Sequence, residues 1–227
     1  MIPVITIDGP GGAGKGTLSR LLAQQLGFHF LDSGALYRLV ALACVEQQVD
    51  LDDSRYLADI ARNLKVDFKV PLDPAADTEI IFDGRKVNEL IRTESCAKVA
   101  SIISLYPEVR DALVELQRSF LQAPGLVADG RDMGTVIFPE AVLKIFLTAS
   151  SKVRAERRRE QLQAQGIYAN IDHLLHEIEA RDARDQNRSI APLIPAPDAV
   201  IVDTSSLNIP EVLQAVMLEV KRKLGIN

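Results

Sequence analysis

The sequence contains no tryptophan, only two cysteines and only three histidines among its 227 residues. Cys44 and Cys96 lie far apart and form no Cys-x-x-Cys motif, which argues against a disulfide framework and against a cysteine-rich metal site. Both stand among apolar residues in helix-like segments, so we expect two buried free thiols. His29, His173 and His176 lack the spacing of metal ligands, because the one pair that can share a helix face has no third partner. The scarce residue types therefore favour neither a zinc protein nor a disulfide-stapled one.

Long apolar runs and an excess of positive charge are also missing. No stretch approaches the roughly 20 apolar residues that cross a bilayer, and the first residues lack the charged region and cleavage site of a signal peptide. The chain has 26 Lys and Arg against 31 Asp and Glu, which gives a net charge of −5 and predicts no nucleic-acid or membrane partner. We expect a cytoplasmic globular protein and, since no coiled-coil seam is present, a monomer.

The most informative segment that is present is a glycine-rich stretch near the N-terminus. It follows the apolar run 4–7, precedes an amphipathic segment at 18–26, and consists of Gly9, Pro10, Gly11, Gly12, Ala13, Gly14, Lys15, Gly16 and Thr17. Strand, glycine-rich loop and helix in this order are the context of a phosphate-binding loop. Glycines let backbone N–H groups turn toward a polyphosphate, and the following helix points its positive end at the same anion. The alternative is a glycine-rich turn that binds nothing.

The residue after Lys15 departs from the commonest form of this loop. A Ser or Thr usually follows the lysine, and its hydroxyl binds Mg²⁺. Here Gly16 takes that place and Thr17 comes next. We therefore expect Mg²⁺ to be held by nucleotide phosphates and water, with no direct protein ligand.

The apolar runs along the chain predict an α/β fold. Short runs rich in Val and Ile, typical of strands buried on both faces, occur at 4–7, 28–31, 126–128, 142–147 and 199–202. Helical patterns separate them at 15–26, 34–47, 106–122, 152–165, 172–185 and 209–224. This alternation predicts a doubly wound sheet of five parallel strands with helices on both faces, of the P-loop NTPase type. In such sheets ligands bind beyond the carboxyl ends of the strands, where Asp8, Asp32 and Asp129 should cluster.

The region 64–90 reads differently. Apolar and polar residues alternate at 66–70, and further runs at 78–82 and 85–87 flank Asp83-Gly84, which is a hairpin signal. We expect a small antiparallel sheet inserted in the parallel fold. A helix should follow at 93–104 with Thr93 as its N-cap, and Pro107 fits the first turn of the next helix.

Two loops at the predicted ligand edge carry groups that suit a second nucleotide. After the second strand come Asp32 and Ser33, and then Tyr37 and Arg38. Ser33 has an alternative role as a helix cap. The third strand leads into Asp129-Gly130-Arg131-Asp132-Met133-Gly134, where an arginine fork suits a phosphoryl group and Asp132 suits an amino group. A surface turn with a local ion pair is the alternative for this loop.

Two arginine-rich helices follow. Arg154, Arg157, Arg158 and Arg159 lie on a helix that either is a solvated face or swings cations over Lys15. This helix and the next, joined near Gly166, are typical of a mobile lid. Arg181, Asp185 and Arg188 stand at i, i+4 and i+7, which predicts one helix face suited to a phosphate and a ribose. A ladder of exposed ion pairs is the alternative.

These four motifs occur in the same order in the bacterial cytidylate kinase family, which the sequence resembles along nearly its whole length. The matching segments are Gly-Pro-Gly-Gly-Ala-Gly-Lys-Gly-Thr, Asp-Ser-Gly-Ala-Leu-Tyr-Arg, Asp-Gly-Arg-Asp-Met-Gly-Thr-Val-Ile-Phe-Pro and Arg-Asp-Ala-Arg-Asp-Gln-Asn-Arg. The resemblance implies transfer of the γ-phosphoryl group of ATP to CMP or dCMP with Mg²⁺. It also implies one domain over 1–227, with an inserted monophosphate-binding subdomain at about 62–105 and a lid at about 150–170.

The resemblance assigns roles to residues of this chain. The ATP phosphates would lie on residues 9–17. The groups expected to act in catalysis are Lys15, Arg131, Asp132, Arg157 and Arg158. The groups expected to bind CMP are Ser33, Tyr37, Arg38, Ser101, Arg110, Arg131, Asp132, Arg181, Asp185 and Arg188. Among these, Ser33, Arg110, Asp132 and Arg188 would surround the cytosine, Arg38 and Arg131 the phosphate, and Ser101, Arg181 and Asp185 the sugar, with Arg181 also able to reach the phosphate.

Other functions fit the loop less well. Another P-loop small-molecule kinase, acting on UMP, another nucleotide, shikimate or gluconate, remains an alternative, although the Arg181–Asp185–Arg188 pattern favours a nucleotide. A switch GTPase lacks support because no Asn-Lys-x-Asp guanine-reading motif is found. A non-catalytic nucleotide-binding module has no need of the acceptor-side arginines that this chain retains.

Overall fold

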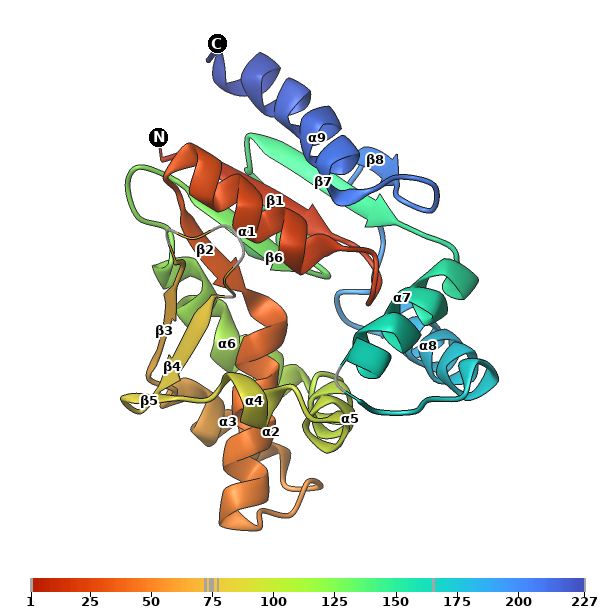
Figure 1. Ribbon diagram of the computed structural model, residues 1–227. Coiled ribbons are helices and arrows are strands. Elements are labelled where there is room, and N and C mark those ends of the chain that lie inside the picture. Colours follow the sequence, from red (N-terminus) through yellow and green to blue (C-terminus); the bar gives the residue numbers. More distant parts are fainter. Residues whose placement is uncertain (1, 72, 74–75, 77, 165, 227) are drawn as a thin grey trace.

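The computed structural model describes residues 2–71, 73, 76, 78–164 and 166–226. Five strands form one parallel sheet in the order β2-β6-β1-β7-β8 (Figure 1). They are β1 (Val4–Asp8), β2 (His29–Asp32), β6 (Leu126–Gly130), β7 (Leu143–Thr148) and β8 (Val200–Asp203). The predicted doubly wound sheet of five parallel strands is confirmed, with each predicted strand within two residues of its observed bounds.

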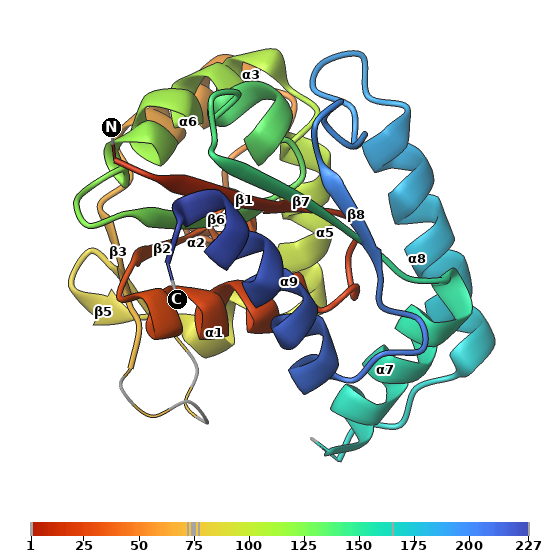
Figure 2. The same cartoon turned by 90° about the horizontal axis from the view of Figure 1, so that it is seen from above.

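Helices cover both faces of this sheet because its strands are apolar on both sides. Along β6, Leu126 and Ala128 enter one core cluster and Val127 enters the other, as the alternation of side chains along a strand requires. Figure 2 shows α1 (Lys15–Leu26) and α9 (Ile209–Leu224) on one side, and α3 (Ser54–Arg62) and α6 (Pro107–Ser119) on the other. The fully buried Leu22 of α1 lies in the same core cluster as Val216 of α9.

The helix α2 (Ser33–Gln47) is almost entirely apolar and enters the larger core cluster. It leads into the predicted insert, whose antiparallel sheet consists of β3 (Val66–Lys69), β4 (Glu79–Phe82) and β5 (Arg85–Lys86). Asp83 and Gly84 both have positive φ, as the predicted two-residue hairpin requires. Residues 72, 74, 75 and 77, between β3 and β4, lie outside the described residues.

Two short helices flank the small sheet, and α3 and α4 (Asn88–Ile91) were not predicted. The sequence of α3 gives a weak apolar pattern, because its only buried residues are Leu57, Ala58 and Ala61. The helix α5 (Glu94–Ile103) matches its prediction, and Thr93 caps it by accepting from the Cys96 N–H.

The two arginine-rich helices α7 (Ser151–Ala164) and α8 (Ile171–Gln186) pack against each other beside the main sheet (Figure 1). Their contact is a small cluster centred on Ala155, Leu162 and Leu174, separate from the two main cores. The predicted helix at 152–165 is confirmed as far as Ala164, and residue 165 lies outside the described residues. Among the described residues, the apolar cluster of α7 and α8 is separate from the apolar clusters of the sheet.

Two other expectations needed correction. The helix expected at 106–122 runs from Pro107 to Ser119 and ends five residues before Pro124. The loop expected at 129–134 continues into a π-helix, η1 (Met133–Ile137), in which the Phe138 N–H donates to the Met133 carbonyl five residues back. No helix in the described part of the chain is both long enough and apolar enough to cross a membrane.

Candidate active site

The phosphate-binding loop, residues 9–17, runs from the end of β1 into α1. Gly9 and Gly12 have positive φ, and a Cβ added at Gly9 would lie only 2.1 Å from the Leu147 carbonyl oxygen. Gly14, at φ 91°, precedes the first residue of α1, and no side chain caps the first N–H groups of this helix. Backbone N–H groups at an uncapped helix start bind anions. The loop therefore has the backbone geometry that the sequence pattern predicts.

Lys15 is buried in this loop. Its Nζ donates to the Pro10 carbonyl at 3.1 Å and lies 3.9 Å from Oδ1 of Asp129 at the end of β6. Burial, together with the cations Arg131 and Arg181, lowers the pKa of Lys15 to about 8. Burial also raises the pKa of Asp129 to about 7, although Lys15 favours its charged form. Lys15 is therefore a buried cation beside two further cations, a position that an anionic ligand stabilises.

Asp8, at the end of β1, is occupied by the neighbouring strand connection. Its two carboxylate oxygens accept from the N–H groups of Met133 and Gly134, both at 2.8 Å. The predicted meeting of Asp8, Asp32 and Asp129 at the carboxyl edge is confirmed, since Asp8 is in register with Gly130 and Asp32 with Asp129. Asp8 fixes the start of η1, which sets the position of Arg131 and Asp132 just before it.

The guanidinium groups of two arginines lie beside the phosphate-binding loop. A Cβ added at Gly11 would lie 3.6 Å from Nη2 of Arg131 and 3.8 Å from Nη1 of Arg181. Burial, reinforced by Arg131, lowers the pKa of Arg181 to about 10. Within the described chain, the buried Nε of Arg181 has no hydrogen-bond partner. Positive charge is thus concentrated at one point with an unused donor, which is what an anionic ligand requires.

Asp185 of α8 is the main carboxylate among these arginines. Arg131 donates from Nε to its Oδ2 at 3.1 Å, and Arg131, Arg181 and Arg188 together hold the pKa of Asp185 below its usual value despite burial. The prediction that Arg188 continues the helix face was wrong, because α8 ends at Gln186. Arg188 nevertheless stays beside Asp185, donating from Nε to its carbonyl oxygen, and its Nη2 is buried without a partner among the described residues.

A second group of predicted residues meets between α2 and α6. Arg110 of α6 forms a buried ion pair with Asp132, and its guanidinium lies 5.8 Å from the centre of the Tyr37 ring. Burial raises the pKa of Tyr37 to about 12. Ser33 does not cap α2, because Asp32 does so by accepting from the Ala35 N–H. The Ser33 hydroxyl instead donates to Gln117.

Arg38 and Ser101 belong to elements around this group. Arg38 of α2 donates from Nη1 to the Ile91 carbonyl at 2.8 Å, and burial lowers the pKa of its guanidinium. Ser101 lies half-buried on α5, and its carbonyl accepts from the Ser104 hydroxyl. No contact of the Ser101 side chain with the other predicted residues is seen in the described chain.

Arg157 and Arg158 of α7 contact different parts of the structure. Arg157 donates to Thr204, whose hydroxyl lies 3.2 Å from the Ala13 carbonyl of the phosphate-binding loop. Arg158 lies 3.7 Å from Glu94 at the start of α5, so α7 meets the insert there. Arg157 and Arg158 are the two expected to act in catalysis, whereas Arg154 was named only as one of the four arginines of this helix.

Arg154 is the lid arginine that touches the phosphate-binding loop directly. It donates from Nη1 to the Gly11 carbonyl at 3.1 Å, from Nε to the Ala149 carbonyl, and pairs with Asp182 of α8. It is also buried, unlike Arg157, Arg158 and Arg159. No local signal separates it from the other three arginines, because its partners come from distant segments.

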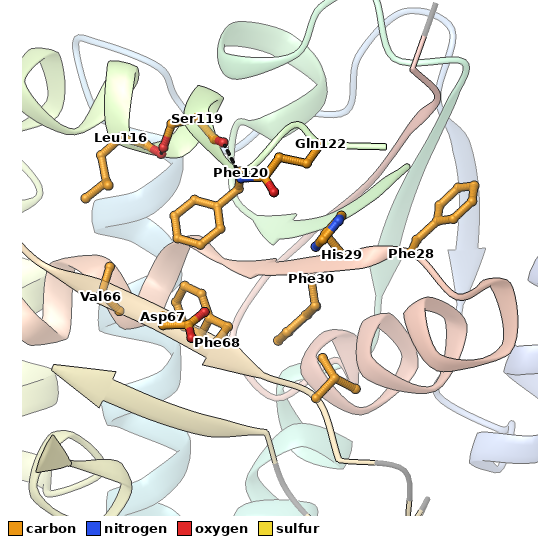
Figure 3. Close-up of a pocket in the computed structure, with 11 residues that line it drawn as sticks. Phe28, His29, Phe30, Val66, Asp67, Phe68, Leu116, Ser119, Phe120 and Gln122 are labelled. Carbon is orange, nitrogen blue, oxygen red and sulfur yellow. Dashed lines mark hydrogen bonds between the residues drawn. The ribbon is translucent and has the colours of Figure 1, made fainter. Parts of the chain in front are cut away.

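The cavity in Figure 3 lies elsewhere. It has a volume of about 440 Å³ and is formed where the start of β2, β3 and the end of α6 meet, with the rings of Phe30, Phe68 and Phe120 on its walls. None of the predicted site residues lines it. A cavity of about 560 Å³ between Leu105 and the end of α8 is different, because Arg188 lies on its wall. The chemistry of the side chains places the candidate site beside the second cavity.

Comparison with known proteins finds similarity over nearly the whole length of this chain. A family model described as cytidylate kinase matches residues 5–222. The cytidylate kinase of Aeromonas hydrophila is 52% identical over 225 residues, which is 99% of this chain and 96% of that protein. The cytidylate kinases of Shewanella pealeana and Klebsiella pneumoniae are 49% and 48% identical, each over 99% of this chain and at least 97% of the relative.

The burial of Asp8 predicts a pH-dependent stability. Burial raises the pKa of Asp8 to about 6 in the folded protein, from 3.8 in the unfolded chain. The raised pKa of Asp8 therefore contributes fully to the free energy of unfolding below about pH 4. This contribution is lost as the pH rises through about 6. Relative to Asp8→Asn, the wild type should lose up to about 3 kcal/mol of unfolding free energy over this window. Urea unfolding at a series of pH values measures the difference between the two proteins. A difference that stays constant with pH would contradict a buried, ionising Asp8.

Proposed function

The chain belongs to the cytidylate kinase family, and on this premise we propose that the residues around Lys15 and Arg131 transfer the γ-phosphoryl group of ATP to CMP or dCMP. The protein is an ATP-dependent nucleoside monophosphate kinase with ATP and CMP as substrates. The observation that carries the residue assignment is the position of Arg131 and Arg181 beside Gly11. These two cations come from other elements and lie beside the phosphate-binding loop. The loop can therefore bind the ATP phosphates while the two arginines bind the CMP phosphate next to them.

The donor side consists of the phosphate-binding loop and its supports. The N–H groups of residues 9–17 and the start of α1 bind the ATP phosphates, with Lys15 on the terminal ones. Lys15 must leave the Pro10 carbonyl to reach them, and a bound polyphosphate offers far stronger charge-assisted hydrogen bonds than a neutral carbonyl. Arg157 and Arg158 add charge from α7, and Arg154 holds α7 to the loop at Gly11.

The acceptor side binds CMP through three groups of residues. Arg38, Arg131 and Arg181 take the phosphate, where the unpaired Nε of Arg181 finds its partner. Asp185 and Ser101 accept and donate at the sugar hydroxyls. The base lies among the remaining predicted residues, which are Ser33, Tyr37, Arg110, Asp132 and Arg188.

Mg²⁺ fits this site as a companion of the nucleotide. In the described chain no three His, Cys, Asp or Glu side chains are grouped to hold a metal ion, so the ion would be held by ATP phosphates and water. A Cβ added at Gly16 would lie 3.5 Å from Oδ2 of Asp129, so this carboxylate stands where a loop hydroxyl usually faces the ion and would accept from its water. When bound, Mg²⁺ supplies positive charge to the phosphate oxygens.

Phosphoryl transfer needs positioning and charge more than proton transfer. The attacking group is an oxygen of the CMP phosphate, which is already ionised, so no general base is required. Two polyanions repel each other, and Lys15, Arg131 and Arg181 offset that repulsion while holding the attacking oxygen in line with the γ-phosphorus. As the bond to the β–γ bridging oxygen breaks, the electrons pass to ADP, whose phosphates stay on the loop. Asp132, fixed by Arg110, keeps the base and hence the acceptor phosphate in position.

The inserted subdomain and the lid serve the acceptor side and the donor side of this site. Residues at about 62–105 form the monophosphate-binding subdomain, and residues at about 150–170 form the lid within a single domain. Closure of the lid over the loop excludes water and suppresses ATP hydrolysis. The protein acts as a cytoplasmic monomer without a nucleic-acid or membrane partner.

Replacement of Lys15 tests the donor side. Lys15→Ala should lower kcat by at least about 100-fold at saturating ATP and CMP. The substitution removes a positive charge that stabilises the transition state more than the bound substrates. A coupled assay of ADP release measures it, with Lys221→Ala on the exposed end of α9 as the matched control. Near-wild-type turnover by Lys15→Ala would contradict the role given to this lysine.

Base selection tests the acceptor side and separates the alternatives. CMP and dCMP should exceed UMP and AMP in kcat/KM by about 100-fold or more, because a wrong base leaves buried polar groups such as Asp132 unpaired. The same ADP-release assay should include shikimate and gluconate, which the other P-loop kinases would phosphorylate. Equal kcat/KM for CMP and UMP would contradict the assignment of the base-binding residues.

A further inference from the structure

The Ser33 hydroxyl is held in one direction by a buried glutamine. Ser33 is the first residue of α2 and Gln117 belongs to α6; Ser33 is 3% exposed and Gln117 1% exposed. The hydroxyl donates to Oε1 of Gln117 at 2.7 Å. Since Asp32 caps α2, the fold does not need this hydroxyl at the helix start. Its hydrogen is thus directed away from α2 and toward α6.

The orientation of the Gln117 amide is also fixed. Its Nε2 donates to the Leu113 carbonyl at 3.2 Å. A flipped amide would place Oε1 against that carbonyl oxygen, and two acceptors cannot share a hydrogen bond. Oε1 therefore faces Ser33 and accepts from it. As a result, the Ser33 oxygen presents only its lone pairs to a ligand.

Arg110 and Gln117 act from the same face of α6. They stand at i and i+7 on its buried side, together with Leu113 at i+3. Arg110 pairs with Asp132 and Gln117 binds Ser33, so this one face holds both groups. Asp132, as a carboxylate, is also an acceptor. One helix thus fixes two side chains that accept hydrogen bonds and offer none.

We propose that Gln117 is a positioning residue that makes the site select an amino group over a carbonyl at position 4 of the pyrimidine, and hence CMP over UMP. The proposal rests on the function proposed above, in which Ser33 and Asp132 meet the base. Cytosine carries N–H donors at this position, whereas uracil carries an acceptor. An unrestrained serine hydroxyl would rotate to donate to uracil, and the Gln117 hydrogen bond prevents that rotation.

The test is a variant series assayed with CMP and with UMP. Gln117→Met and Gln117→Leu remove the acceptor at nearly constant volume, and each should lower the ratio of kcat/KM for CMP to that for UMP by about tenfold. Gln117→Glu is the matched control, because a protonated carboxyl group keeps a carbonyl oxygen for Ser33 and a hydroxyl donor for the Leu113 carbonyl. Its ratio should stay within about threefold of the wild type. Two apolar replacements are included so that failure of one to fold leaves the other.

A double-mutant cycle with Ser33→Ala separates positioning from packing. In the Ser33→Ala background, Gln117→Met should leave the ratio unchanged, because no hydroxyl remains to be oriented. Equal losses for CMP and UMP in Gln117→Met, or the same effect with and without Ser33, would overturn the proposal. A wild type that does not prefer CMP would defeat the proposed function instead, so the two failures are distinguishable.

Discussion

The site depends on an imbalance of buried charge at the carboxyl edge of the parallel sheet. Lys15, Arg131 and Arg181 are brought together there by three different elements, and most carboxylates near them already have partners. Asp8 is used by two backbone N–H groups, and Asp185 is shared among three arginines. Burial, with the neighbouring cations adding to it, lowers the pKa values of Lys15 and Arg181. A protein gains no stability from such a cluster, so its retention is explained by the phosphates that neutralise it.

The surrounding structure keeps these charges apart from solvent and in position. Asp8 fixes the turn that carries Arg131 and Asp132, and the buried face of α6 fixes the groups proposed to read the base. The lid is joined to the phosphate-binding loop mainly by polar contacts, above all through Arg154 at Gly11. A polar contact of this kind can be remade when a nucleotide enters, whereas a large apolar contact would resist movement. We therefore propose that the sheet and α6 carry base selectivity and that α7 and α8 control access to the site.

Local signals were sufficient for a large part of this architecture. The helices α1 and α9 begin and end where the sequence predicts, because the glycine-rich loop with Gly27 marks the ends of one, and the Asn208 capping box with Gly225 those of the other. The π-helix η1 could not be predicted, because it depends on Asp8 from a strand far away in sequence. The role of Arg154 could not be predicted either, because only its contacts with Asp182 and Gly11 distinguish it from the neighbouring arginines. In the sequence, Gln117 likewise resembles any polar residue of an amphipathic helix. Contacts between distant segments carry no pattern in a single sequence.

Proton uptake on binding tests the charge imbalance most directly. Isothermal titration of ATP near pH 8, repeated in buffers of different ionisation enthalpy, counts the protons that accompany binding. A terminal phosphate beside Lys15 should raise the pKa of this lysine from about 8, so ATP should bind with proton uptake and adenosine, which lacks the phosphates, without it. Equal proton uptake for ATP and adenosine, or none for either, would contradict a site built from cations that lack their counter-charge.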